Sequence, residues 1–238
     1  MMTNNLIAQI RQTLIENSDE KTRAGSQRYF KEPITVHGVK AATVKKISKE
    51  FFSEVKDKPK FEIFNLCELL WQSGFLEESF IACDWSDRLK KQFEPADFET
   101  FERWIKNYVN NWASCDTLCN HTVGNFVMMY PEFIKKLKEF AHSENRWVKR
   151  ASAVSLIIPA RKGMFLSDIF EIAGILLTDK DDMVQKGYGW MLKAASQANQ
   201  QQVFEFVMQN KMLMPRNALR YAIEKMPEEL KKKAMIKE

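Results

Sequence analysis

The stretch NRWVKRASA at residues 145–153 aligns with DDMVQKGYG at residues 181–189, at an offset of 36 residues. In both stretches a polar cap leads to a valine, a cation follows two positions later, and small residues occupy the next and third positions after the cation. Small residues let one helix backbone approach another, and a cation at a fixed place in each repeat produces a charged stripe. Repeats of this length are stacked helix pairs that build a curved solenoid with one concave surface.

Apolar residues recur at helical spacing through most of the chain, as in Val44, Ile47, Phe51 and Val55. Convincing strand alternation is missing, and prolines, glycines and polar caps divide the sequence into about a dozen helices of ordinary length. These patterns predict an all-α helical-repeat solenoid. An irregular helical bundle is the alternative, because only two stretches repeat well and a third, starting at Asn111, fits more loosely.

The composition is that of a globular protein, with 45% hydrophobic and 28% charged residues among 238. No Pro/Gly/Ser-rich stretch divides the chain, so we expect one domain over residues 1–238. The apolar stretches are far shorter than the roughly 20 residues that span a bilayer, and the N-terminus lacks a signal-peptide core. Four scattered cysteines indicate reduced thiols. We therefore expect a cytoplasmic monomer with no membrane partner.

Charge is distributed unevenly along the sequence, although the formal net charge is only +5. Segments 31–60, 135–150 and 216–237 are net basic, whereas residues 77–102 are net acidic. A folded chain with this pattern would present one basic and one acidic face. A basic concave face would attract a polyanion.

Three short segments combine an indole with charged side chains: Trp112 with Asp116; Trp147 with Arg146, Lys149 and Arg150; and Trp190 with Lys186. Residues four apart share one face of a helix. Periodicity alone favours Trp112 and Trp190 as core residues, because tryptophan is mostly buried. It also favours Asp116 as a helix N-cap or solvated charge, and Arg150 and Lys186 as solvated surface charges.

Gly187 and Gly189 lie inside a predicted helix, where each weakens the helix by about 1 kcal/mol relative to alanine. Two reasons for such a cost are open at this point. One is close packing against a neighbouring helix, and the other is close approach of a large ligand's backbone.

Taken together, Trp112-x-x-x-Asp116, the helix start at residues 146–150 and the segment 185–190 resemble the AlkD-type DNA alkylation-repair glycosylases in order and spacing. The fold of that family is a HEAT-like helical-repeat solenoid. The likeness covers most of the chain, and it includes a turn at residues 38–40 before the third helix. Residues 113–115 and 187–188 depart from the residues expected at these places in close relatives.

The resemblance implies that Asp116, Trp112 and Trp190 are catalytic and line a cleft on the basic concave face. It also implies that Arg150 contacts the DNA backbone, and we assign Lys186, Lys149 and Arg146 to DNA binding with it. The implied activity is that of a monofunctional glycosylase of base excision repair, without metal or organic cofactor. Its partner would be double-stranded DNA carrying cationic alkylpurines such as 3-methyladenine and 7-methylguanine.

Two other functions are compatible with a basic helical solenoid. One is a non-catalytic protein that recognises branched or distorted DNA, and the other is a protein-interaction scaffold of the HEAT type. Release of free base from methylated DNA would separate the glycosylase from both.

Three further features have simpler interpretations. Cys115, Cys119 and His121 could offer three zinc ligands, but a fourth is not evident, so we expect buried thiols. The methionine-rich run at residues 208–214 is expected to fill the core at a helix junction. The lysines at 231–233 are expected to form a solvated helix end, with contact to DNA as the alternative.

Overall fold

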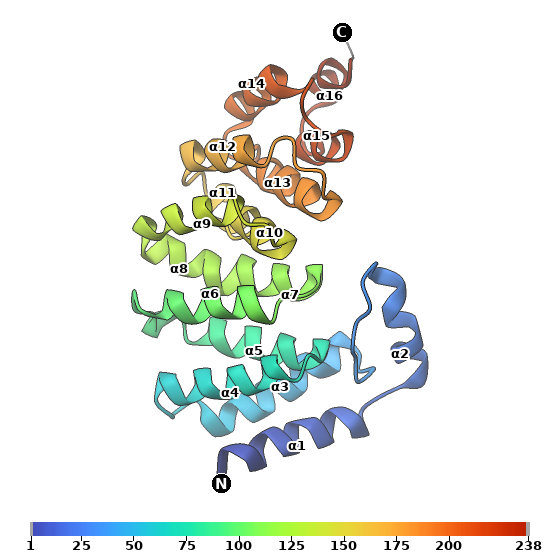
Figure 1. The fold of residues 1–238 in the computed structure, drawn as a ribbon, viewed down its shortest axis with the longest axis vertical. Helices are drawn as coiled ribbons and strands as arrows, with labels where there is room; N and C mark the ends of the chain where they lie inside the picture. Colours follow the sequence, from blue (N-terminus) through green and yellow to red (C-terminus); the bar gives the residue numbers. More distant parts are fainter. Residues whose placement is uncertain (1, 237–238) are drawn as a thin grey trace. The chain divides into compact units, whose positions relative to one another are not determined.

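The computed structural model describes residues 2–236, and helices make up most of this part of the chain (Figure 1). Its α-helices are α1 (Met2–Glu16), α2 (Glu20–Ser26), α3 (Ala41–Val55), α4 (Lys60–Gln72), α5 (Leu76–Arg88), α6 (Asp97–Asn107), α7 (Trp112–Thr117), α8 (Gly124–Met129), α9 (Ile134–Ala141), α10 (Arg146–Val154), α11 (Ile157–Arg161), α12 (Leu166–Ile175), α13 (Asp182–Ala195), α14 (Gln200–Asn210), α15 (Arg216–Ile223) and α16 (Glu228–Met235). The prediction of an all-α fold is confirmed.

Four short α-helices of five to seven residues, α2, α7, α8 and α11, bring the number among residues 2–236 above the dozen expected, and four further short segments are helical but not α. Three are 3₁₀ turns, at Gln27–Tyr29, Lys90–Gln92 and Pro131–Phe133, and the π-helical segment Leu118–Val123 lies between α7 and α8. No helix within residues 2–236 combines the length and the apolar character needed to cross a membrane.

Two compact units, residues 1–118 and 119–238, make up the chain, and each is described by itself. In a stack of repeats each repeat contacts mainly its neighbours, so a division of this kind also arises inside one domain. The single domain over residues 1–238 stays a prediction.

The first unit is built around α5, against which α3, α4 and α7 pack, while α1 packs against α3 and α4. Trp85 and Trp104 are fully buried in this core, and Phe64 meets Trp104 edge to face at 5.7 Å. Aromatic pairs in this geometry add about 0.5–1.5 kcal/mol beyond the burial of their surface.

The turn before α3 is fixed by buried carboxylates at the start of α5. Glu77 accepts hydrogen bonds from the backbone N–H groups of residues 37–39 at 2.8–3.0 Å. Its neighbour Glu78 lies 3.0 Å from both the His37 Nε2 and the Arg11 Nε atoms. The predicted turn before the third helix is confirmed, and α3 begins at Ala41.

A second carboxylate, Glu68, links α4 to α6 in the first unit. It accepts hydrogen bonds from Trp104 Nε1 at 2.5 Å, Tyr108 Oη at 2.6 Å and Arg103 Nη2 at 3.0 Å. Burial opposes its ionisation, but the hydrogen bonds from Arg103, Tyr108 and Trp104 outweigh this effect and lower its pKa.

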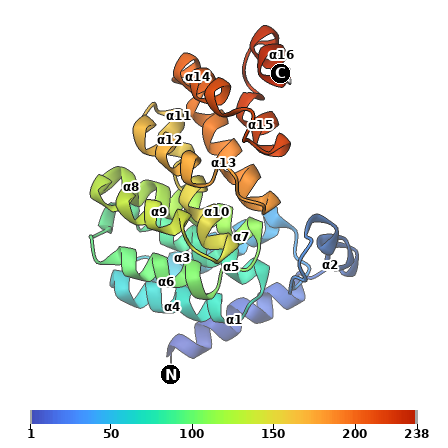
Figure 2. The same cartoon turned by 45° about the horizontal axis from the view of Figure 1, so that its top comes forward.

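In the second unit α10, α13 and α15 lie side by side and run parallel (Figures 1 and 2). The contacts between α13 and α15 show that these two helices run in the same direction. Gly189 approaches Ala218, and further along both helices Lys193 pairs with Glu224 at 2.8 Å. The polar caps predicted for the repeat are confirmed. Asn145 accepts from the Trp147 N–H at 2.8 Å, and Asp181 accepts from the N–H groups of residues 183 and 184 at 2.8 and 3.1 Å.

Close helix packing is the reason for both glycines of α13. A Cβ atom built on Gly189 would lie 2.7 Å from Tyr221 Cβ and 2.8 Å from the Ala218 carbonyl oxygen on α15. A Cβ atom on Gly187 would lie 3.3 Å from Arg150 Cγ on α10. Both glycines therefore face protein, and the alternative of a ligand backbone is not needed to explain them.

We expect Gly189→Ala to destabilise the protein by about 2–3 kcal/mol, because the added methyl group collides with the backbone of α15. Gly174→Ala is the matched control, since a Cβ atom at Gly174 in α12 would meet nothing within 4 Å. The control should stabilise the protein by about 0.5 kcal/mol through its better helix propensity. Urea unfolding of both variants measures the difference, and equal stabilities would contradict the packing argument.

The lowered pKa of Glu68 predicts a pH-dependent contribution to stability. A carboxyl group with a depressed folded pKa stabilises the protein above its unfolded value of about 4.3, and this contribution is lost as the pH falls through the folded pKa. The difference in melting temperature between the parent and Glu68→Gln should therefore be largest above about pH 5 and shrink toward pH 3. The exposed Glu54→Gln control should show no such trend.

Candidate functional site

Trp112 and Asp116 lie on one face of α7, four residues apart. The cap of this helix is Asn111, whose side chain accepts from the Ser114 N–H at 2.9 Å. Asp116 is therefore inside the helix, and its interpretation as an N-cap was wrong. Its side chain is partly exposed, so the carboxylate is accessible to solvent.

The indole of Trp112 is fixed from two sides by the segment that follows α2. Its Nε1 atom donates a hydrogen bond to the Tyr29 carbonyl oxygen at 3.1 Å, and its ring stacks on Phe30 with centroids 5.3 Å apart. The ring is nevertheless partly exposed. The expectation of a core residue from periodicity was wrong for Trp112, and the two contacts hold the indole at the surface in one orientation.

A largely apolar hollow of about 260 Å³ lies beside this indole in the first unit. Its wall contains four aromatic side chains, from Tyr29, Phe30, Phe80 and Trp112. Tyr29 is 75% exposed. Sequence reasoning missed the roles of Tyr29 and Phe30, because they join Trp112 across a separation of about 80 residues that no local pattern encodes.

Arg150 in α10 is buried, with only 5% of its surface exposed. Its guanidinium donates to the Met183 carbonyl oxygen in the first turn of α13, and its stem packs against Gly187. The expectation of a solvated surface charge was wrong for this residue. Its phosphate contact stays a prediction, and the small exposed part of the side chain would have to make it.

The other three predicted DNA-binding cations pair with carboxylates at the start of α13. Lys149 Nζ lies 2.5 Å from Asp179, Arg146 Nε lies 2.9 Å from Asp181, and Lys186 Nζ lies 3.2 Å from Asp182. All three cations keep part of their side chains exposed, between 21% and 32%. A phosphate group that binds here would therefore compete with carboxylates for the same cations.

Trp190 lies on α13, four residues after Lys186, and its side chain is partly exposed. The expectation of a core residue was wrong for this indole as well. Trp112 and Asp116 belong to the first unit, whereas Trp190 and the four cations belong to the second. The assembly of these residues into one catalytic site stays a prediction.

The predicted thiols are buried, since Cys115 and Cys119 have no exposed surface, whereas His121 is exposed. Within the described part of the chain, no three His, Cys, Asp or Glu side chains are grouped so as to hold a metal ion.

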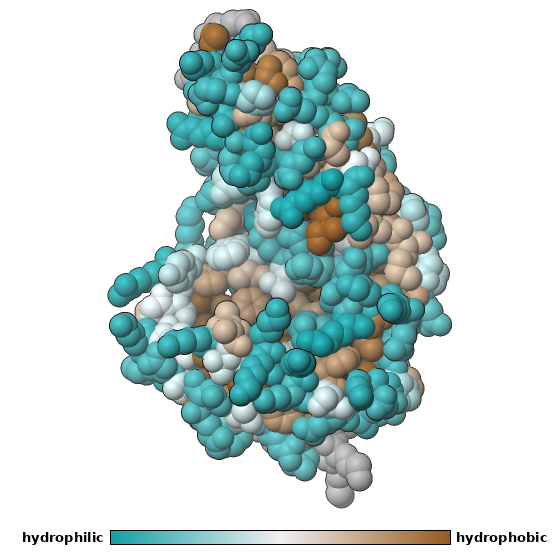
Figure 3. All heavy atoms as spheres, turned by 180° about the vertical axis from the view of Figure 1, so that it is seen from behind, coloured by the Kyte–Doolittle hydropathy of each residue, from teal (hydrophilic) through white to brown (hydrophobic). Residues whose placement is uncertain are grey.

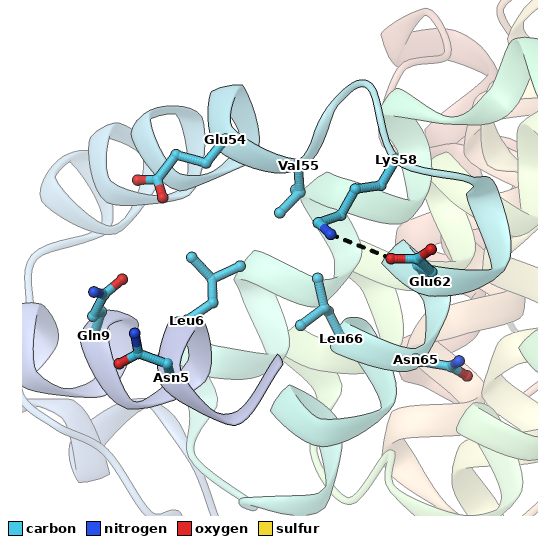
Figure 4. A pocket seen from close by; sticks show the side chains of 9 residues that line it. All are labelled: Asn5, Leu6, Gln9, Glu54, Val55, Lys58, Glu62, Asn65 and Leu66. Carbon is cyan, nitrogen blue, oxygen red and sulfur yellow. Dashed lines mark hydrogen bonds and ion pairs between the residues drawn. The ribbon is translucent and has the colours of Figure 1, made fainter. Parts of the chain in front are cut away.

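A larger hollow, of about 390 Å³, lies between α1, α3 and α4 (Figure 4). Apolar side chains such as Leu6 and Val55 point into it, together with an ion pair of 3.3 Å between Lys58 and Glu62. Among the described side chains that line it, none of the predicted catalytic or DNA-binding residues is present. The predicted catalytic and DNA-binding residues all lie on α7, α10 and α13.

The model of the DNA alkylation repair enzyme family matches residues 10–226. This chain belongs to the DNA alkylation repair enzyme family. The family resemblance inferred from the motifs is thereby confirmed, and membership places the chain among enzymes that act in the repair of alkylated DNA.

A solved structure, titled a predicted DNA alkylation repair enzyme from Enterococcus faecalis, superposes on this family member with a TM-score of 0.80. The two sequences are 20% identical, and the match covers 89% of this chain and 98% of that one. At this identity the likeness shows the fold, which supports the predicted helical-repeat architecture. No curated protein sequence matches the chain significantly.

The ion pair of Lys149 predicts how this DNA alkylation repair enzyme responds to loss of a competing carboxylate. Asp179→Asn removes the negative charge but keeps an acceptor for the Asp181 N–H, which now donates to Asp179 at 2.8 Å. Affinity for undamaged duplex should rise several-fold at low salt, because Lys149 becomes available to phosphate. Fluorescence anisotropy with a labelled duplex measures this change.

Asp168→Asn provides the matched control, because Asp168 pairs with Lys138 at 2.9 Å, away from the predicted DNA-binding cations. An equal rise in both variants would show a general effect of net charge and contradict the local competition.

Proposed function

We propose that this family member is a monofunctional DNA glycosylase that hydrolyses the N-glycosidic bond of cationic N-alkylated purines in duplex DNA. The observation that carries the proposal is the exposure of two particular indoles. Four of the six tryptophans are buried, with exposed fractions between 0% and 6%, whereas Trp112 and Trp190 are partly exposed. These two are the indoles that the family resemblance assigns to catalysis.

The leaving group of this reaction already carries a positive charge. When the bond between C1′ and the purine nitrogen breaks, its electron pair moves to the base, which departs neutral, and the sugar becomes an oxocarbenium ion. Water then adds to C1′ and loses a proton. The enzyme therefore needs no general acid for the base, but it needs negative charge beside the sugar.

Asp116 is suited to supply this charge. Its carboxylate can stabilise the cationic sugar and can orient the attacking water or accept its proton. Its place inside α7 sets its direction relative to the indole of Trp112, because residues four apart project from the same helix face.

Trp112 is suited to contact a cationic sugar with the face of its ring. Attraction between a cation and an indole face is worth about 0.5–2 kcal/mol. The hydrogen bond to the Tyr29 carbonyl oxygen and the stack on Phe30 fix this ring before the substrate arrives, so little ordering remains to be done in the transition state. We assign the same role to Trp190.

The cations of α10 and α13 are suited to hold the DNA backbone. Arg146, Lys149 and Lys186 would exchange their carboxylate partners for phosphates, and Arg150 would join them through its exposed part. Such contacts set the position of the duplex but do not read its sequence. This fits an enzyme whose lesions occur at any position in a genome.

The decisive substitution is Asp116→Asn, which keeps the shape of the side chain and removes its charge. Base release should fall by on the order of a hundredfold or more, the loss typical of one preorganised electrostatic group. Affinity for undamaged duplex should hold or rise slightly, because a charge that repels phosphate is gone. Mass spectrometry of the bases released from DNA treated with a methylating agent gives the rate.

Asp57→Asn is the control, because Asp57 is an exposed carboxylate outside the site in the first unit. It should release base at the parental rate. The mechanism would be contradicted if the Asp116→Asn protein released base at the parental rate while circular dichroism showed it to be folded. A parent protein that binds duplex but releases no base would favour the non-catalytic DNA-binding alternative.

A further inference from the structure

The parallel arrangement of α10, α13 and α15 places a cation at the same position of each helix. The fifth residues of these helices are Arg150, Lys186 and Arg220. Since Gly189 approaches Ala218, the first turn of α15 lies next to the middle of α13. Together with the Lys193–Glu224 pair, this contact places Arg216 level with Lys186, and Arg220 lies one helical turn further along.

The loop before α15, residues 211–215, exposes two large apolar side chains at its tip. Met212 is 65% exposed and Leu213 is 62% exposed, whereas Met214 is buried at 6% and anchors the loop. The expectation that the methionine-rich run fills the core is correct for Met214 and wrong for Met212. The surface at the end formed by α14–α16 is mostly hydrophilic, with a few apolar areas (Figure 3).

Cations flank this apolar tip on both sides. Lys211 Nζ donates to the Ile236 carbonyl oxygen at 3.2 Å, and the Arg216 guanidinium donates to the Met235 carbonyl oxygen at 3.3 Å. These bonds hold the tip against the end of α16, so its backbone is fixed on both sides. Arg220, one helical turn after Arg216, is exposed.

We propose that residues 211–220 are a further DNA contact, in which Met212 and Leu213 enter the minor groove as an apolar wedge and Arg216 and Arg220 contact the flanking phosphates. The proposal rests on the duplex binding of the proposed function. Proteins that deform DNA frequently insert methionine or leucine between base steps from the minor groove, with cations on either side. Deformation of the duplex beside a lesion weakens stacking, which exposes the glycosidic bond to the catalytic groups.

Charge complementarity favours DNA as the occupant. The tip directly precedes Arg216, which lies level with the partly exposed Lys186, and the neighbouring α16 adds lysines at positions 231–233. An anionic lipid surface is the competing ligand, because a basic surface with an apolar tip also suits a membrane interface. The experiment includes both.

Two substitutions separate the apolar from the ionic part of this contact. Met212→Ser/Leu213→Ser should weaken binding to an undamaged duplex by roughly tenfold without changing the salt dependence, because apolar contacts release no counterions. Arg220→Ala should weaken binding and reduce the slope of log K against log salt concentration by about one. A duplex with 2-aminopurine at its centre should gain fluorescence with the parent protein and lose that gain with the double variant.

Controls are available for both parts. Met129→Ser replaces another exposed methionine, and Lys225→Ala replaces an exposed cation just beyond the opposite end of α15. Neither should change duplex binding. Circular dichroism checks that each variant is folded, and Leu213→Gln alone serves as a milder change if the double variant unfolds.

Unchanged duplex affinity in the folded wedge variants would overturn the proposal. So would binding to phosphatidylserine vesicles that is lost in the double variant while duplex affinity is retained. None of these readouts requires base release. A parent protein that binds duplex but releases no base would therefore contradict the proposed glycosylase activity and leave the proposed wedge unaffected.

Discussion

The close approach of parallel helices in the second unit is the constraint on which the charged surface depends. At Gly189 the backbones of α13 and α15 come so near that a single methyl group would collide with Ala218 and Tyr221. At Gly187 the stem of Arg150 takes the space that a side chain would need. Helices packed this closely in parallel bring their first turns to one edge, so cations near each helix start accumulate there. The weak helix propensity of two glycines is thereby offset by packing that also aligns the charges.

This accumulation creates an electrostatic problem in the free protein. Arg146, Lys149 and Lys186 would repel one another if they stood alone, and the carboxylates at residues 179–182 offset that repulsion. In the proposed complex with DNA, exchange of carboxylate for phosphate would replace one ion pair by another, so the net gain per contact would be small. Weak, salt-sensitive binding of this kind lets a protein move along undamaged DNA.

Local features of the sequence predicted the helices and the caps at Asn145 and Asp181, because each depends on residues within a few positions. The turn before α3 was predicted from the family resemblance, and the carboxylate that fixes it, Glu77, lies about 40 residues away in the sequence. Features that depend on distant partners were not predictable in this way. The orientation of Trp112 depends on a carbonyl group 83 residues away, and the burial of Arg150 depends on α13. Periodicity therefore assigned the indole to the core and the arginine to the surface, and both assignments were wrong. The roles proposed for these two residues come from the family resemblance and stay predictions.

The two partly exposed indoles carry a free-energy cost that the four buried ones avoid. An apolar ring left in water forgoes a stabilisation on the order of 25 cal/mol for each Å² that burial would remove from solvent. In the free protein this stabilisation is missing at Trp112 and Trp190. A ligand that covers the exposed ring surface gains this burial free energy when it binds, so the stabilisation that is missing in the folded protein contributes to affinity instead. A cationic ligand gains further from the ring quadrupole, whereas a neutral sugar gains only the burial. In the proposed mechanism the same exposed surface would favour the charged transition state over the ground state, which is the property that catalysis requires.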